Sequence, residues 1–152
     1  MYKRGESSLI RQEFWTVFGK YMMPVRSSEG LRVNWINYKT GIKDVYFRME
    51  TLNESASVSI SIEHSDAGIR ALFFEQFQEL KLVFDDTLKE EWDWQQDVAV
   101  NGRMISRIIK ELPNTSVFNK DQWPDLISFF KKRIRTLDKF WEDAKYSFET
   151  LK

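Results

Sequence analysis

The chain has 152 residues, of which 42% are hydrophobic, 15% aromatic and 30% charged, enough apolar material for a single domain spanning residues 1–152. Lys and Arg number 23 and Asp and Glu number 23, and this balance argues against bulk electrostatic attraction to nucleic acid or to a membrane. The absence of cysteine excludes disulfides, thiol catalysis and thiolate metal sites. We find no signal-peptide core and no membrane-spanning run, so we expect a cytoplasmic protein.

Charge is unevenly distributed along the chain. Residues 51–100 contain eleven acidic and three basic side chains, whereas residues 1–50 contain nine basic and five acidic ones. Residues 101–152 are again basic, with eleven basic and seven acidic side chains. An acidic middle between basic ends predicts ion pairs within the fold, or alternatively between subunits.

The first half of the chain predicts one helix followed by three strands. Ser7 or Ser8 is expected to cap the helix, which Pro24 ends. Strands are expected at 33–38, at 45–51 and at 57–63, and the last two show clear alternation of apolar and polar side chains. The short turns between them are typical of an antiparallel meander.

The second half predicts a helix, a hairpin and a long helix. Ser65 or Asp66 is expected to cap a helix whose apolar spacing continues to Phe84. Asn101-Gly102 is a strong hairpin signal between strands at about 92–100 and 103–112, although residues 103–112 also fit a helix. From Trp123 to Phe148 apolar residues repeat at intervals of three and four, which predicts a long helix packed on the protein's own sheet or, alternatively, shared in a dimer.

These elements predict an α+β fold of two layers, in the order α-β-β-β-α-β-β-α. An antiparallel sheet of about five strands would carry helices on one face. The other face would present small and polar side chains, either solvated or as a partner or dimer surface. The residues assigned to this partner face are Ser57, Ser59, Ser61, Tyr46 and Arg48.

Catalytic and metal-binding patterns are weak. His64, the single histidine, stands beside Glu63 between a strand and a helix cap, and no nucleophile motif accompanies it. The acidic residues between 85 and 97 lack calcium-loop spacing. We therefore expect no catalytic residue, no metal site and no cofactor, and we keep an enzyme centred on Glu63 and His64 as an alternative.

The last helix carries a local basic face. Four basic residues are expected along one side of it, and nucleic acid is the partner that such a face would contact: Lys131, Lys132, Arg135 and Lys139. Trp92 and Trp94 alternate on the preceding hairpin and would stack on bases if exposed. The competing interpretations are that the basic residues form a solvated helix face and that the two tryptophans belong to the core.

Several segments together resemble the bacterial family catalogued as domain of unknown function 4268. They are EFWTVF in the first helix, SVSISIEH, ISRI at 105–108, and DQWPDLISFFKKRI at the start of the last helix. The resemblance implies a structural family without transferable site residues. Members often look like the C-terminal half of longer bacterial proteins whose other half resembles a restriction-endonuclease-like domain. This chain begins with the helix, and we expect no nuclease domain in it.

From these observations we expect an interaction or accessory module, with a protein partner or a second copy of the chain as the main partner. Work beside a DNA-processing or defence system is what the resemblance implies. Direct binding of nucleic acid through the last helix is the alternative function.

Overall fold

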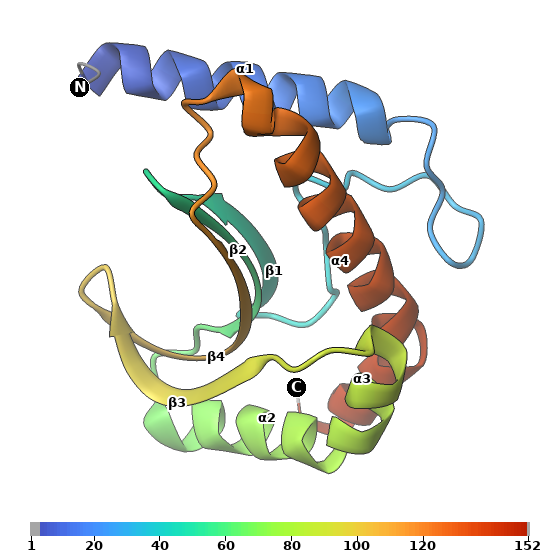
Figure 1. Ribbon diagram of the computed structural model, residues 1–152. Helices are drawn as coiled ribbons and strands as arrows, with labels where there is room; N and C mark the ends of the chain where they lie inside the picture. The colour runs from blue at the N-terminus through green and yellow to red at the C-terminus, as the bar shows by residue number, and fades with distance from the viewer. Residues whose placement is uncertain (1–3, 152) are drawn as a thin grey trace.

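A computed structural model describes residues 4–151 as four α-helices, two short 3-10 helices and one antiparallel sheet with strand order β1-β2-β4-β3 (Figure 1). The elements in chain order are α1 (Arg4–Met22), β1 (Val45–Thr51), β2 (Ser55–Ile62), α2 (Ala67–Glu79), α3 (Lys81–Leu88), β3 (Asp93–Val100), β4 (Arg103–Pro113), η1 (Lys120–Gln122), α4 (Trp123–Ala144) and η2 (Lys145–Leu151). Within residues 4–151, every helix is too short or too polar to span a lipid bilayer.

The sheet has one apolar and one mainly polar face, because side chains alternate along each strand. Phe47, Ile60, Ile108 and Trp94 form a cross-strand row on the apolar face. The sheet is strongly curved, and its convex side faces the helices (Figure 1). The opposite, concave face carries the serines of β2.

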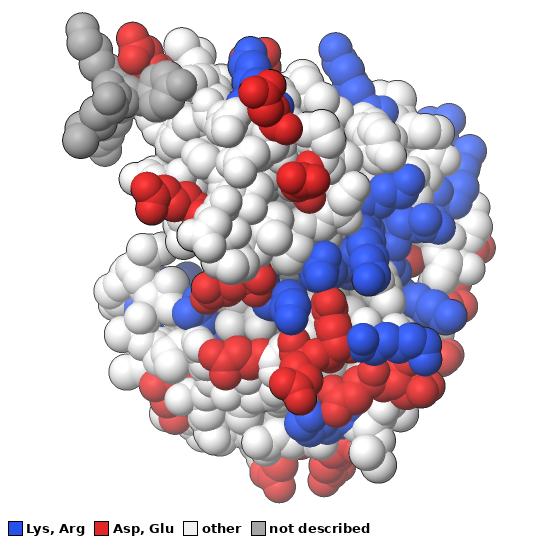
Figure 2. Space-filling view, in the orientation of Figure 1, with Lys and Arg blue, Asp and Glu red and all other residues white. Residues whose placement is uncertain are grey.

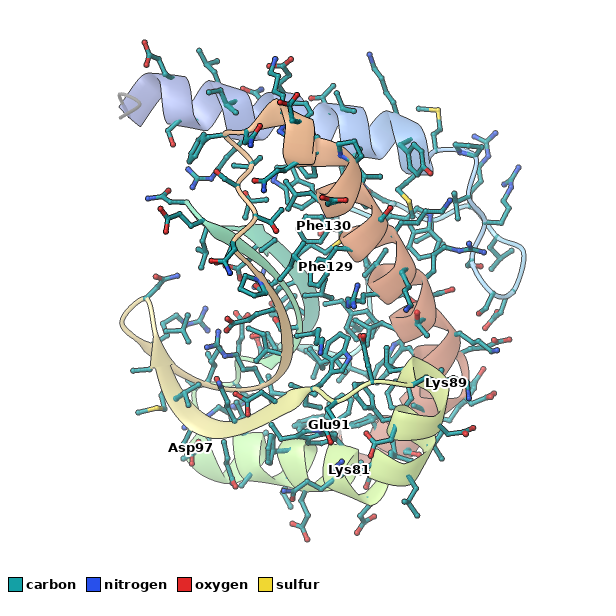
Figure 3. The ribbon with its side chains drawn as sticks, in the orientation of Figure 1. Lys81, Lys89, Glu91, Asp97, Phe129 and Phe130 are labelled. Carbon is teal, nitrogen blue, oxygen red and sulfur yellow. The ribbon has the colours of Figure 1, made fainter. Side chains whose placement is uncertain are left out.

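Helix α4 lies across the convex face and closes the core. Phe129 and Phe130 point from α4 toward the sheet and the neighbouring helices (Figure 3). The ring of Phe130 lies 6.0 Å from that of Phe14 and 5.9 Å from that of Phe18, measured between centroids. The apolar seam of α4 is thus buried within one chain, which confirms packing on the protein's own sheet and helices.

The predicted strand at 33–38 is wrong, and the sheet has four strands instead of about five. Val33 and Trp35 do turn inward, but no neighbouring strand pairs with this backbone. Side chains fix the segment instead: Trp35 Nε1 donates to the Val25 carbonyl, and Trp141 Nε1 donates to the Thr40 carbonyl. Residues 23–44 therefore form a long loop tied to the core by indole hydrogen bonds.

Helix boundaries differ from the prediction in two places. Helix α1 already includes Arg4, so Ser7 and Ser8 lie inside it and do not cap it. The second helical segment is two helices, because the chain bends at Leu80, whose φ of −95° and ψ of 8° end α2. Asp66 caps α2 as expected, accepting a hydrogen bond from the Ile69 amide.

The hairpin prediction is confirmed. Asn101 and Gly102 have φ angles of 50° and 78°, the left-handed conformations that a type I′ turn requires. Residues 103–113 form strand β4, so the helical alternative for this segment is wrong. The coarse α+β architecture is as predicted, with helices on one face of an antiparallel sheet.

Candidate functional site

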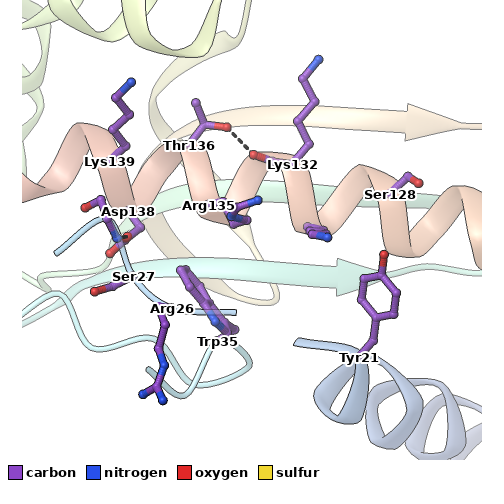
Figure 4. Close-up of a pocket in the computed structure, with 12 residues that line it drawn as sticks. Tyr21, Arg26, Ser27, Trp35, Ser128, Lys132, Arg135, Thr136, Asp138 and Lys139 are labelled. Atoms are coloured by element: carbon purple, nitrogen blue, oxygen red, sulfur yellow. Dashed lines mark hydrogen bonds between the residues drawn. The ribbon is translucent and has the colours of Figure 1, made fainter. Parts of the chain in front are cut away.

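A groove of about 720 Å³ lies between α4, the C-terminal end of α1 and the 23–44 loop (Figure 4). In Figure 4, Tyr21 and Arg26 lie on one side of α4, whereas Lys132 and Lys139 extend from the helix away from that side. We call this the basic groove, and its lining residues are Tyr21, Arg26, Ser27, Ser28, Trp35, Ser128, Lys131, Lys132, Arg135, Thr136, Asp138 and Lys139.

The structure brings all four basic residues predicted on the last helix together in this groove. Positions 131, 132, 135 and 139 fall within about 100° of helical arc, because each residue advances the helix by about 100°. Lys132, Arg135 and Lys139 are exposed, and Lys131 places its ammonium 4.9 Å from the centroid of the Tyr21 ring. Thr136 donates to the Lys132 carbonyl within the helix (Figure 4).

These cations have no ion-pair partner among residues 4–151. Arg133, in the same KKRIR run, differs from these cations. Its side chain is only 15% exposed and pairs with Glu90 at 2.9 Å. Helical periodicity turns Arg133 away from its basic neighbours. The groove therefore collects five unpaired positive charges, the fifth being Arg26 from the loop.

Asp138 is the single acidic residue of the groove, and it is used to hold the loop. Its carboxylate accepts a hydrogen bond from the Ser28 amide at 2.8 Å and another from the Tyr38 hydroxyl at 2.6 Å. Burial, followed by the hydrogen bond to Asp138, raises the pKa of the Tyr38 phenol far above its usual value. The phenol stays protonated as a donor, and the wall that carries Arg26 is fixed against α4.

The surface reflects this distribution of charge. Figure 2 shows blue Lys and Arg side chains in a band over α4 and the adjacent loop, with red Asp and Glu side chains gathered below, over α3. Several basic residues outside the groove have acidic partners: Lys81 pairs with Asp85, and Lys120 pairs with Glu13. Five cations without an ion-pair partner among residues 4–151 thus lie together around the basic groove.

Trp92 and Trp94 do not reach the groove. Trp92 is buried against Phe84, and Trp94 is half-buried between Phe74 and Phe84, so both belong to the core. The aromatic side chain that does line the groove is Tyr21, which is 49% exposed. Tyr21 shares helical spacing with the buried Phe14 and Phe18, yet its own ring lies largely outside the core.

The predicted partner face lies on the concave side of the sheet, but its serines are covered. Ser57, Ser59 and Ser61 are buried, whereas Tyr46 and Arg48 are exposed and stack, with the guanidinium 4.3 Å from the ring centroid. Any partner on this face would meet Tyr46 and Arg48 before the serines. The assignment of the face to a partner stays a prediction.

Glu63 is buried on this face among arginines. It accepts two hydrogen bonds from Arg48, at 2.9 and 3.0 Å, one from Arg103 at 3.2 Å and one from Ser61 at 2.8 Å. Burial alone would raise the pKa of this carboxyl, but the hydrogen bonds from Arg48 and Ser61, with the charges of Arg48 and Arg103, lower it below its usual value. Glu63 is a fixed anion rather than a proton donor.

His64 has a separate, local contact. Its Nδ1 accepts a hydrogen bond from the Asp66 amide at 3.0 Å, next to the cap of α2. The acidic residues between 85 and 97 serve other groups, as when Asp97 pairs with the buried Arg70 at 3.0 Å. Within residues 4–151, no three Asp, Glu or His side chains converge as a metal site.

Sequence reasoning missed the wall of the groove opposite α4. Arg26 and Tyr21 come from the loop and from α1, more than 100 positions before Lys131, the first basic residue of α4. Arg26 stands in a polar segment without periodicity, and nothing in the sequence indicates which face it joins. Asp138 offered a signal, since it is an acidic residue among apolar positions of an amphipathic helix.

Comparisons with known proteins place the chain in a family without indicating an activity. No curated protein and no solved structure matches it. The family model described as Domain of unknown function (DUF4268) matches residues 10–145. That match covers most of the chain, and the chain belongs to this family.

Proposed function

We propose that the protein binds nucleic acid through the phosphate backbone, using the basic groove. The observation that carries this proposal is the set of five cations without acidic partners, gathered from α4 and the loop around one groove. Unpaired surface cations in a row are the usual counterpart of a chain of phosphates. The exposed Tyr21 ring at the edge of the groove offers a stacking surface for an unpaired base.

The spacing of the cations suits successive phosphates. Lys132 and Lys139 are separated by seven residues, or about 10 Å along the helix axis at a rise of about 1.5 Å per residue. One strand of duplex DNA carries a phosphate about every 3.4 Å along its axis, so this row spans about three phosphates. Three to five contacts predict a slope of about −3 to −4.5 for the logarithm of affinity against the logarithm of salt concentration.

The test is binding of fluorescein-labelled 20-mer DNA, single-stranded and duplex, measured by fluorescence anisotropy over a range of salt concentrations. The triple variant Lys132→Gln, Arg135→Gln, Lys139→Gln removes three groove cations. We expect weaker binding and a salt slope that is shallower by about 1 for each lost contact.

A matched control removes the same charge elsewhere. Lys81, Lys89 and Lys120 are basic residues with acidic partners outside the groove, and Figure 3 shows Lys81 and Lys89 near α3. Their triple change to Gln should leave the affinity and the slope close to wild type. Equal losses in both triple variants, or binding of wild type that does not weaken with salt, would refute the proposal.

The proposal is compatible with an accessory role beside a DNA-processing partner, the role implied by the resemblance to proteins with restriction-endonuclease-like halves. In that arrangement the groove would hold the nucleic acid while a partner performs the chemistry. Binding of a protein partner, or of a second copy of the chain, also remains a proposal.

A further inference from the structure

A second pocket lies on the concave face of the sheet, on the side opposite the helices and the basic groove. It has a volume of about 390 Å³ and is formed by β1, β2, β4 and the turn of the β3-β4 hairpin. Its charged lining residues are Arg48, Arg103, Arg107, Glu50 and Glu63. We call it the arginine pocket.

The guanidinium groups around this pocket retain free donors. Arg48 uses its Nε and one terminal nitrogen on Glu63, and Arg103 uses both terminal nitrogens on the Glu63 carboxylate and carbonyl. Arg107 uses only its Nε, which donates to Gln95 at 2.7 Å, so both of its terminal nitrogens are available. Glu63 thus orients Arg48 and Arg103, and Arg107 lies in the same pocket with free donors.

Ser59 adds a donor that the protein leaves unused. Its side chain lines the pocket and is only 5% exposed, yet its hydroxyl has no hydrogen-bond partner among residues 4–151. Ser61, its neighbour on the same face, does have a partner, Glu63. The Ser59 oxygen is not fully enclosed, so it is open to a ligand or to water in the pocket.

The remaining lining suggests the shape and charge of the ligand. Three arginines and two glutamates leave one net positive charge in the pocket. Val100 and Ile105 supply apolar surface, and Ile105 is buried on this face, apart from the main core. Ile105 lies between Arg103 and Arg107 on the same face of β4, so apolar surface adjoins the donors, and this arrangement fits a monoanion that has an apolar body.

We propose that the arginine pocket binds a carboxylate attached to an apolar group, with Arg103, Arg107 and Ser59 donating hydrogen bonds to its oxygens. Guanidinium forks match the planar geometry of a carboxylate. The carboxylate could belong to a small organic acid or to the C-terminus of a peptide.

The experiment is an NMR titration of ¹⁵N-labelled protein with hexanoate, hexanamide, inorganic phosphate and an acetylated tripeptide ending in leucine. We expect hexanoate or the tripeptide to shift the Ser59 amide and the Arg103 and Arg107 Nε–H signals saturably. Saturation by hexanoate would indicate a small acid, and saturation by the tripeptide alone would indicate a chain terminus. Hexanamide should not saturate these signals.

Two variants test the contacts without disturbing the fold. Arg107→Gln leaves the Glu63 cluster intact, and loss of a charged hydrogen bond should weaken binding about tenfold. Ser59→Ala removes a hydroxyl that has no protein partner, so it should weaken binding without lowering the melting temperature. The triple Gln variant of the basic groove should bind hexanoate like wild type.

Several outcomes would overturn the inference. Equal shifts with hexanamide would show that the carboxylate is not recognised. Saturation by phosphate alone would identify a different anion. Shifts confined to the basic groove, or full affinity in Arg107→Gln, would remove the arginine pocket as the binding site.

Discussion

Replacing Asp138 by Ala removes the carboxylate that ties the 23–44 loop to α4. Two hydrogen bonds disappear, one from the Tyr38 hydroxyl at 2.6 Å and one from the Ser28 amide at 2.8 Å. Asp138 is only 6% exposed, and its side chain lies where the loop wall meets the helix. The change should therefore lower global stability and loosen the wall that carries Arg26.

The magnitude follows from the two bonds and their surroundings. Hydrogen bonds to a charged group contribute about 1.5–3 kcal/mol each. Ser28 is exposed and Tyr38 half-buried, so water replaces part of what is lost and the lower end of this range applies. We expect Asp138→Ala to cost about 3 kcal/mol, which corresponds to a melting temperature lower by about 6–12 °C in a domain of this size.

A double-mutant cycle separates the Tyr38 contact from the rest. Tyr38→Phe removes one hydrogen bond but retains ring stacking on Phe47 at 5.0 Å, so it should cost about 1.5 kcal/mol. Combined with Asp138→Ala it should cost no more than Asp138→Ala alone, a coupling of about 1.5 kcal/mol. Urea unfolding followed by tryptophan fluorescence measures all four proteins, and strictly additive costs would refute the anchoring role of Asp138.

Three further predictions concern the sheet, the core and the hairpin. Because the pKa of Glu63 is lowered from 4.5, the stability advantage of wild type over Glu63→Gln should be largest above about pH 4.5 and shrink as the pH falls, in urea unfolding at several pH values. Phe130→Ala should cost about 3–5 kcal/mol in the same assay, whereas Leu82→Ala, at an 85% exposed position, should change stability by less than about 0.5 kcal/mol. Gly102→Ala should cost about 1–2 kcal/mol, since φ is 78° there, and an unchanged melting temperature would contradict the turn assignment.

Much of the fold could be predicted from local patterns, because those patterns reflect local geometry. The spacing from Trp123 onward predicts α4, and Asn101-Gly102 predicts the β3-β4 turn. The error at 33–38 has a physical cause: the side chains of VNWINY suit a strand, but a strand also needs a neighbour for its backbone. That neighbour is a non-local feature, and here indole hydrogen bonds replace it.

The candidate site likewise has one part that local sequence patterns predict and another that depends on non-local contacts. Helical periodicity alone groups the four cations of α4 and turns Arg133 away from them. The opposite wall depends on the path of the loop, which Asp138 and Tyr38 fix across 100 positions of sequence. The arginine pocket is less accessible still to sequence reasoning, since it depends on the register that sets Ser61 opposite both Tyr46 and Arg107.

A net charge of zero is compatible with a basic groove. Net charge governs attraction at long range, whereas the groove acts on a ligand at contact distance. A net charge of zero removes attraction at long range, where the protein acts as a single charge. At physiological ionic strength, screening limits the reach of exposed charges to about 8 Å, so a bound phosphate is affected mainly by its nearest side chains. Acidic residues of the middle segment are paired with Arg48, Arg103 and Arg133, away from the groove. Asp138 alone is acidic among the lining residues, so the acidic residues that balance the groove lie outside it, and the groove cations remain free to act at contact distance.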